Sequence, residues 1–144
     1  MTQKTFVLVH GAWHGGWCWR RVADRLEKQG HKVFTPTLTG LGERSHLMSP
    51  GIDLDTHIND VVNVIKWEDL KGVCLVAHSY GGWPVSGALE KILDRVSSTV
   101  FLDADAGVGT AGSGVTADKI VDMRPEAAIS ITPSDLPDFL GRIR

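Results

Sequence analysis

The stretch LVAHSYGGW (75–83) decides the fold. It places Ser79 directly after an apolar run and directly before an amphipathic segment. A strand that ends in small–x–Ser–x–Gly and turns at once into a helix makes a tight bend, where only small flanking residues avoid a clash. Ala77, a mild departure from glycine, and Gly81 fill those positions. We therefore predict that Ser79 projects above the C-terminal edge of a sheet; the alternative is a serine that only caps the helix.

Strand and helix patterns alternate on both sides of this stretch. Short, apolar, often β-branched runs predict strands over residues 5–11, 31–38, 72–79 and 98–104. Between them, apolar residues recur at intervals of three and four, which is typical of amphipathic helices. Such alternation favours a parallel sheet covered on both faces. We predict an α/β three-layer sandwich with a mainly parallel sheet of about four strands in the order 2-1-3-4.

The character of the chain changes after residue 104. Residues 105–116 are rich in Gly, Ala, Ser and Thr and predict a loop. The segment ADKIVDM (117–123) predicts a short helix, and apolar residues at helical spacing predict a last helix over 134–143. We expect residues 1–144 to form a single α/β domain, in which 105–144 is an atypical loop and helical tail.

Composition narrows the functional class. The chain has 144 residues, 42% of them hydrophobic, and a net charge of −2. These values predict a soluble globular domain and give no electrostatic reason to expect nucleic acid or an anionic membrane as partner. No apolar run has the length of a membrane span or of a signal sequence. The two cysteines, Cys18 and Cys74, suggest no disulfide framework, so a cytoplasmic location is expected.

Three linked motifs carry a resemblance to a known family. In this order and spacing, LVHGAWHGGWCW (8–19), PTLTGLGERSH (36–46) and LVAHSYGGW (75–83) resemble the α/β-hydrolase superfamily. The most similar branch holds hydroxynitrile lyases and plant-type methylesterases. The resemblance covers residues 1–104, about the first half of a family domain. It implies a serine esterase or lyase that acts on small esters or cyanohydrins and uses no cofactor.

The resemblance also implies an oxyanion hole. In the family, one amide comes from the residue after the nucleophile, here Tyr80, and another from the loop that follows an adjacent strand. If the first strand lies beside the third, the glycine-rich loop 10–16 faces Ser79. We choose the amide of Ala12 as the second donor.

The catalytic base and acid are harder to assign. The family implies a Ser–Asp–His triad in that order, but all six histidines precede Ser79. His10 and His14 lie on the loop expected opposite Ser79, where either one hydrogen-bonds the serine or both brace the loop. His78 is adjacent, but successive side chains near a strand end point apart. Asp103 ends the fourth predicted strand and is a candidate acid; its alternative role is to cap the following turn.

The sequence also contains patterns that could bind a metal ion or a nucleotide. His10 and His14 have i, i+4 spacing, but they lie on a glycine-rich loop without a third ligand, so no metal site is expected. The segment GVGTAG (107–112) satisfies G-x-G-x-x-G and raises a nucleotide-binding hypothesis. The acids of the preceding DAD (103–105) would repel a pyrophosphate, so a flexible loop is the better interpretation.

Magnitudes limit the activity expected of this chain. In a serine hydrolase, loss of the histidine alone costs on the order of a million-fold in kcat, while the oxyanion hole and binding retain roughly a thousand-fold over water. A chain without the late histidine should therefore show at most trace esterase activity. The sequence leaves open a truncated or redesigned hydrolase and a non-catalytic natural or engineered scaffold. An exposed sheet edge makes self-association an expectation in either case.

Overall fold

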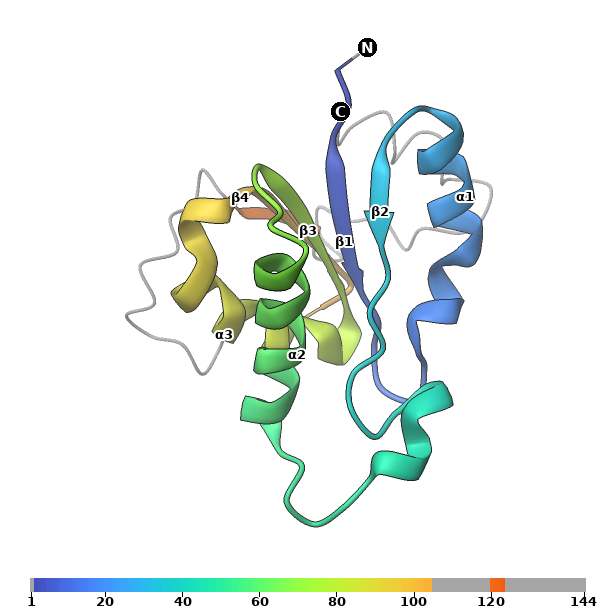
Figure 1. Cartoon of the computed structure of the whole chain (residues 1–144), viewed down its shortest axis with the longest axis vertical. Helices are drawn as coiled ribbons and strands as arrows, with labels where there is room; N and C mark the ends of the chain where they lie inside the picture. Colours follow the sequence, from blue (N-terminus) through green and yellow to red (C-terminus); the bar gives the residue numbers. More distant parts are fainter. Residues whose placement is uncertain (1, 105–119, 124–144) are drawn as a thin grey trace.

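The computed structural model describes residues 2–104 and 120–123 (Figure 1). Its strands are β1 (Thr5–Val9), β2 (Lys32–Phe34), β3 (Val73–His78), β4 (Val96–Leu102) and β5 (Ile120–Met123). Its α-helices are α1 (Arg20–Lys28), α2 (Leu54–Trp67) and α3 (Gly82–Ile92). Four 3-10 turns join them: η1 (Gly16–Trp19), η2 (Gly42–Leu47), η3 (Ser79–Gly81) and η4 (Leu93–Arg95).

The described strands form one parallel sheet in the order β2-β1-β3-β4-β5. The predicted order 2-1-3-4 is confirmed, and a fifth strand is added beside β4. The register pairs Val9, the last residue of β1, with Ala77 near the end of β3. Because carboxyl ends of parallel strands meet at one edge of the sheet, the loop after β1 and the turn after β3 lie next to each other.

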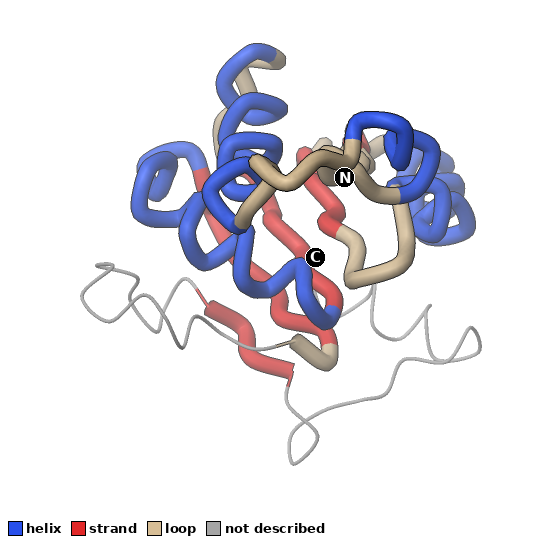
Figure 2. Tube along the Cα trace, turned by 90° about the horizontal axis from the view of Figure 1, so that it is seen from below, coloured by secondary structure: helices blue, strands red, loops and turns tan. Residues whose placement is uncertain are grey.

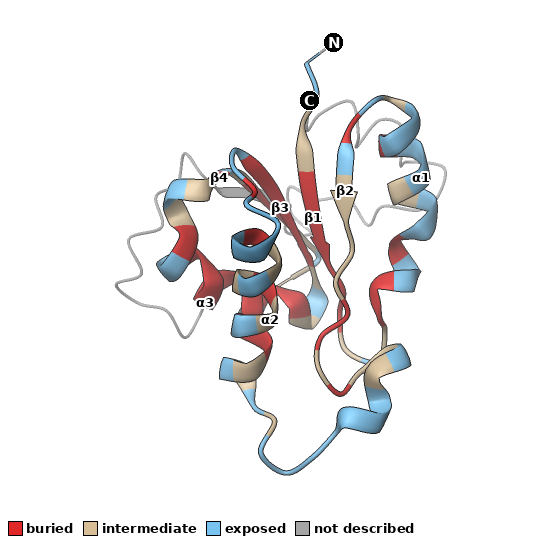
Figure 3. Cartoon of the chain, viewed as in Figure 1, coloured by how far each residue is buried: buried red, intermediate tan, exposed pale blue. Residues whose placement is uncertain are grey.

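Helices cover both faces of the sheet, as the sequence predicted. Figures 1 and 2 show α1 on one side of the strands and α2 with α3 on the other. Strand residues alternate between the two faces, so β1 sends Phe6 and Leu8 toward α1 and Val7 and Val9 toward the other pair. All four side chains are fully or almost fully buried (Figure 3).

Helix α2 is fixed at its start and along its length. The Asp53 carboxylate accepts a hydrogen bond from the amide of Thr56, 3.0 Å away, and the Thr56 hydroxyl lies 3.3 Å from the Asp53 amide, which completes a capping box. Further along, Ile58 packs against Gly87 of α3. A Cβ at residue 87 would lie 2.3 Å from Cδ1 of Ile58, so the absence of a side chain there lets the helices approach closely.

One prediction for the end of the chain was wrong. The segment 117–123 was expected to be helical, but Ile120–Met123 forms β5, parallel to β4. Pairing gives the outer backbone groups of β4 hydrogen-bond partners, and the β-branched Ile120 and Val121 favour a strand. The loop over 105–116, the GVGTAG segment and the last helix over 134–143 lie outside the described residues. The single-domain organisation stays a prediction.

The described residues contain no candidate membrane span and no disulfide. None of the helices in residues 2–104 is long and apolar enough to cross a membrane. Cys18 is exposed and Cys74 is buried, and both are free thiols. Burial raises the pKa of the Cys74 thiol, and partial desolvation of its sulfur raises that of the Cys18 thiol, so neither is activated as a thiolate. The cytoplasmic location stays a prediction.

Candidate active site

Ser79 lies on a sharp turn between β3 and α3. Its φ is +51°, a left-handed conformation that costs a non-glycine residue about 1–3 kcal/mol. The strand ends at His78, and Ser79 opens the single 3-10 turn that leads directly into α3. The buried strand on one side and the buried helix on the other hold this strained conformation, while Ser79 itself is exposed. This is how a strand-to-helix elbow presents a hydroxyl to a substrate.

The loop after β1 packs directly against this turn. A Cβ at Gly81 would lie 2.7 Å from the carbonyl oxygen of His10 and 2.8 Å from that of Val9. A Cβ at Gly11 would lie 3.0 Å from Cβ of Ser79. Glycine at both positions therefore allows the two backbones to meet. The half-buried Ala12 follows Gly11 on this loop, so its amide lies on the segment that faces Ser79.

His10 ties two loops together. It is fully buried; its Nδ1 lies 2.7 Å from the carbonyl oxygen of Gly11, and its Nε2 accepts a hydrogen bond of 3.0 Å from the amide of Leu38. Burial lowers the pKa of His10, which keeps the ring neutral. Because both ring nitrogens are engaged, this geometry favours the bracing role over that of a base for Ser79.

His14 and His78 stack on each other beside the turn. Their ring centroids are 6.3 Å apart with an interplanar angle of 19°, and Trp17 and Trp19 contact them edge-on. Burial lowers the pKa of His78. Nδ1 of His14 is buried and has no hydrogen-bond partner among the described residues. Within the part of the chain that the structure describes, no hydrogen bond joins either ring to Ser79.

Asp103 directly follows β4 and is exposed. Its φ is +45°, so the chain turns sharply there, as it does at Ser79. Its negative charge raises the pKa of His78, against the larger effect of burial. The carboxylate therefore lies close enough to the turn after β3 to act on its electrostatics.

A buried histidine of α2, missed by the sequence analysis, contacts the residue after Ser79. Nδ1 of His57 lies 2.8 Å from the hydroxyl of Tyr80, and its Nε2 lies 2.9 Å from the carbonyl oxygen of Thr39. Thr39 is held in turn by Asp60, which accepts from its amide at 2.6 Å and from its hydroxyl at 2.7 Å. In the sequence, His57 could have been noticed as a polar residue on the apolar face of a predicted helix.

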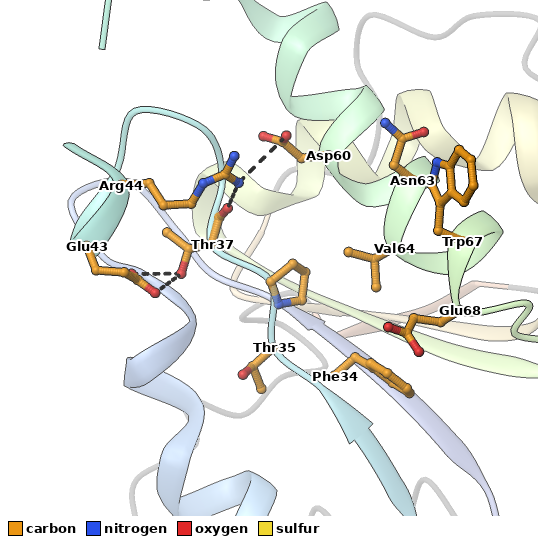
Figure 4. A pocket seen from close by; sticks show the side chains of 11 residues that line it. Phe34, Thr35, Thr37, Glu43, Arg44, Asp60, Asn63, Val64, Trp67 and Glu68 are labelled. Carbon is orange, nitrogen blue, oxygen red and sulfur yellow. Dashed lines mark hydrogen bonds and ion pairs between the residues drawn. The ribbon is translucent and has the colours of Figure 1, made fainter. Parts of the chain in front are cut away.

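A groove of about 630 Å³ lies elsewhere, between the end of β2 and α2 (Figure 4). Two of its three carboxylates already have partners: Glu43 accepts from the hydroxyl of Thr37 at 2.9 Å, and Asp60 binds Thr39 and lies 4.0 Å from Arg44. Ser79 is not part of its lining, which consists of Phe34, Thr35, Pro36, Thr37, Glu43, Arg44, Asp60, Asn63, Val64, Trp67 and Glu68.

Across residues 2–104, no three His, Cys, Asp or Glu side chains gather where they could hold a metal ion.

A parallel α/β sandwich with a serine on a strained strand-to-helix turn, faced by a glycine-rich loop, defines the class of α/β hydrolases. The chain belongs to the alpha/beta hydrolase family, whose model matches residues 6–143. This match extends beyond residue 104, where the resemblance seen in the sequence motifs ended.

Known relatives of this chain include esterases. It is 54% identical over 99 residues to the carbendazim hydrolyzing esterase of Nocardioides sp. (strain SG-4G), covering 69% of this chain and 41% of the relative. It is 36% identical to methylesterase 2 of Arabidopsis thaliana, covering 71% and 40%. The crystal structure of polyneuridine aldehyde esterase aligns with a TM-score of 0.67 at 32% identity, covering 73% of this chain and 42% of that one. The chain thus spans about two fifths of the length of these relatives.

Proposed function

We propose that Ser79 is the nucleophile of a carboxylic ester hydrolase that acts on small esters. The observation that carries this proposal is the left-handed Ser79, exposed at the end of β3 with Gly11 packed against it. The esterases among the relatives support the choice of reaction class. The resemblance to hydroxynitrile lyases keeps cyanohydrin cleavage as an alternative reaction at the same serine.

The reaction follows from the arrangement of the turn. The Ser79 hydroxyl oxygen attacks the carbonyl carbon of the ester while a base removes its proton. The negative charge that forms on the carbonyl oxygen is stabilised by the amides of Ala12 and Tyr80 and by the N-terminal end of α3. Collapse of this intermediate releases the alcohol, which takes up the proton from the base. Water then hydrolyses the acyl-serine and releases the acid.

The base is the part of the site that the described residues supply least well. His10 and His57 have both ring nitrogens engaged, so neither accepts a proton from Ser79 without breaking a contact. His14, whose Nδ1 has no partner among the described residues, stays a candidate base, and Asp103 stays a candidate acid. We expect this 144-residue chain alone to hydrolyse esters only at trace level, and a histidine on a second polypeptide to raise that rate.

A second candidate function has its own supporting observation. Among the described residues no histidine is hydrogen-bonded to Ser79, so the fold is also compatible with a non-catalytic α/β scaffold that keeps the shape of the site. The two candidates differ in whether the Ser79 hydroxyl is activated, because an unactivated serine reacts very slowly with electrophiles.

Intact-mass analysis after treatment with a fluorophosphonate separates these candidates. The hydrolase proposal predicts one adduct per chain in the wild type and in Ser49→Ala, a matched change at an exposed loop serine, but none in Ser79→Ala. Peptide mapping should place the adduct on Ser79. No adduct on a wild-type protein that circular dichroism shows to be folded would leave the scaffold as the function.

A further inference from the structure

The contact between His57 and Tyr80 joins helix α2 to the turn that carries the proposed oxyanion amide. Tyr80 is the middle residue of η3 and is half-buried, whereas His57 is buried. The rings meet edge-to-face with centroids 5.7 Å apart, in addition to the 2.8 Å contact between Nδ1 and the hydroxyl. The capping box and the Ile58–Gly87 contact fix α2, so His57 is a rigid partner.

With a neutral His57 ring, the protons of this network have one consistent arrangement. A backbone carbonyl only accepts, so Nε2 of His57 carries the hydrogen that it donates to Thr39. In the neutral ring Nδ1 is then an acceptor, and the Tyr80 hydroxyl donates to it. Asp60 fixes Thr39 from the other side through two hydrogen bonds. Asp60 therefore orients Thr39, Thr39 orients the His57 ring, and His57 orients the Tyr80 hydroxyl.

We propose that His57 is a positioning residue for the oxyanion hole: by holding the Tyr80 ring, it sets the direction of the Tyr80 amide. This inference rests on the proposed function of Ser79. The turn is a single 3-10 turn whose first residue is strained, and Gly81 is anchored against the carbonyls of Val9 and His10. The ring of Tyr80 provides the second anchor. Without it, the peptide between Ser79 and Tyr80 is free to rotate away from the substrate oxygen.

Four variants separate positioning from general stability. His57→Leu removes both ring nitrogens, and His57→Asn restores an acceptor in the place of Nδ1. Tyr80→Phe removes only the hydroxyl, and Val61→Ala shortens a buried side chain about one helical turn further along α2. The measurements are the amide proton–nitrogen signal and hydrogen exchange of Tyr80 by NMR, and the rate at which a fluorophosphonate labels the protein.

We expect His57→Leu and Tyr80→Phe to shift the Tyr80 amide signal, to speed its exchange and to slow labelling by roughly ten-fold, less than the hundred-fold or more that loss of a whole oxyanion donor costs. A double variant that combines His57→Leu with Tyr80→Phe should be labelled no more slowly than either single one, and His57→Asn should recover most of the rate. Val61→Ala should lower the melting temperature and leave the amide signal and the labelling rate unchanged.

An unchanged Tyr80 amide in both His57→Leu and Tyr80→Phe would overturn the positioning role, as would equal effects from Val61→Ala. If His57→Leu does not fold, His57→Asn and Tyr80→Phe still decide the question, because each keeps most of the packing. If the wild type is not labelled at all, the proposed function fails, whereas the amide signal still shows whether His57 orients the turn.

Discussion

At the scale of single residues, the geometry around Ser79 depends on glycines, because a side chain at these positions would keep the two backbones apart. Gly81 has an ordinary helical conformation, yet it cannot carry a Cβ because two carbonyl oxygens lie less than 3 Å from that position. The contact joins the elbow to the end of β1. The site is thus built by the close approach of two backbones, and the serine motif alone shows only one of them.

Gly81→Ala should lower the free energy of unfolding by about 1–3 kcal/mol, because the methyl group forces β1 and the turn apart. Gly51→Ala is the matched control, since no atom lies closer than 4.0 Å to its Cβ position and Gly51 is exposed. Urea unfolding of both variants checks this. Equal stabilities would show that the two backbones separate without cost.

The sequence predicted some of these residues and not others. Ser79 and the loop opposite it were predictable because small residues at fixed spacing around a serine have one common steric cause. The role of His57 was not predictable, since helical periodicity marks the buried face of α2 but does not show which turn that face covers. The engagement of His10 Nε2 likewise depends on Leu38, 28 residues away.

At the scale of elements, the start of α2 shows how a local interaction titrates. Hydrogen bonds from the amide and the hydroxyl of Thr56 lower the pKa of Asp53 in the folded state. A lowered pKa stabilises the folded protein above the unfolded value of 3.8, and this contribution is lost as the pH falls through the folded value.

Asp53→Ala should therefore be less stable than the wild type at neutral pH, and the difference should shrink as the pH drops below 3.8. Asp53→Asn should keep most of the cap without this pH dependence, because asparagine caps helices about as well as aspartate. Thermal unfolding across the pH range measures both. A pH-independent deficit in Asp53→Ala would show that the carboxylate charge is irrelevant.

The packing of α2 on α3 makes a second prediction. Gly87→Ala places a methyl group onto Ile58 and should cost about 1–3 kcal/mol of stability. Ile58→Val removes Cδ1, the atom nearest to that methyl, and alone should cost about 0.5–1.5 kcal/mol. The double variant should be more stable than the sum of the two losses allows. If chemical denaturation shows that the two losses of stability simply add, the methyl group added by Gly87→Ala does not strain against Ile58.

The strand β5 shows where element prediction fails. A short segment such as 117–123 carries too few residues for its period to distinguish a helix from a strand. The structure resolves this through pairing with β4, an interaction with a strand about twenty residues earlier. Strands β1 and β3 have longer apolar runs, so local pattern sets their type. Strand β2 is only three residues long, and its type was predictable from its place between two helical patterns.

At the scale of the whole molecule, buried histidines link stability to pH. Burial lowers the pKa of His10 and of His78 in the folded protein, so the unfolded chain binds more protons as the pH falls below 6.5. Protonation then favours unfolding, and their contribution is fully present above pH 6.5 and decreases below it.

Stability should thus decline between neutral pH and about pH 5, before the carboxylates titrate. His10→Gln keeps a donor and an acceptor without a titratable ring, so its stability should change less over this range. Urea unfolding at a series of pH values compares the two proteins. A slope in His10→Gln as steep as that of the wild type would mean that His10 does not contribute.

The overall architecture was the most predictable level. Alternating apolar strands and amphipathic helices leave few arrangements in which every apolar face is buried, and the observed order of the first four strands is one of them. The catalytic capacity of the molecule was less predictable, because it depends on whether a base reaches one serine. The distance between the base and Ser79 is set by several loops at once, and each loop has its own side-chain contacts.

Hydrolysis of p-nitrophenyl acetate with and without added imidazole tests the central claim most directly. Wild type should give a trace rate, at most roughly a thousand-fold over water, that imidazole raises and that Ser79→Ala abolishes. Imidazole here stands in for a base at Ser79, and the rate at which imidazole alone cleaves the ester is subtracted from every measurement. Equal rates in the wild type and Ser79→Ala would contradict Ser79 as nucleophile, and turnover on the order of 10 per second without imidazole would contradict the trace activity expected of this chain and point to His14 as its base.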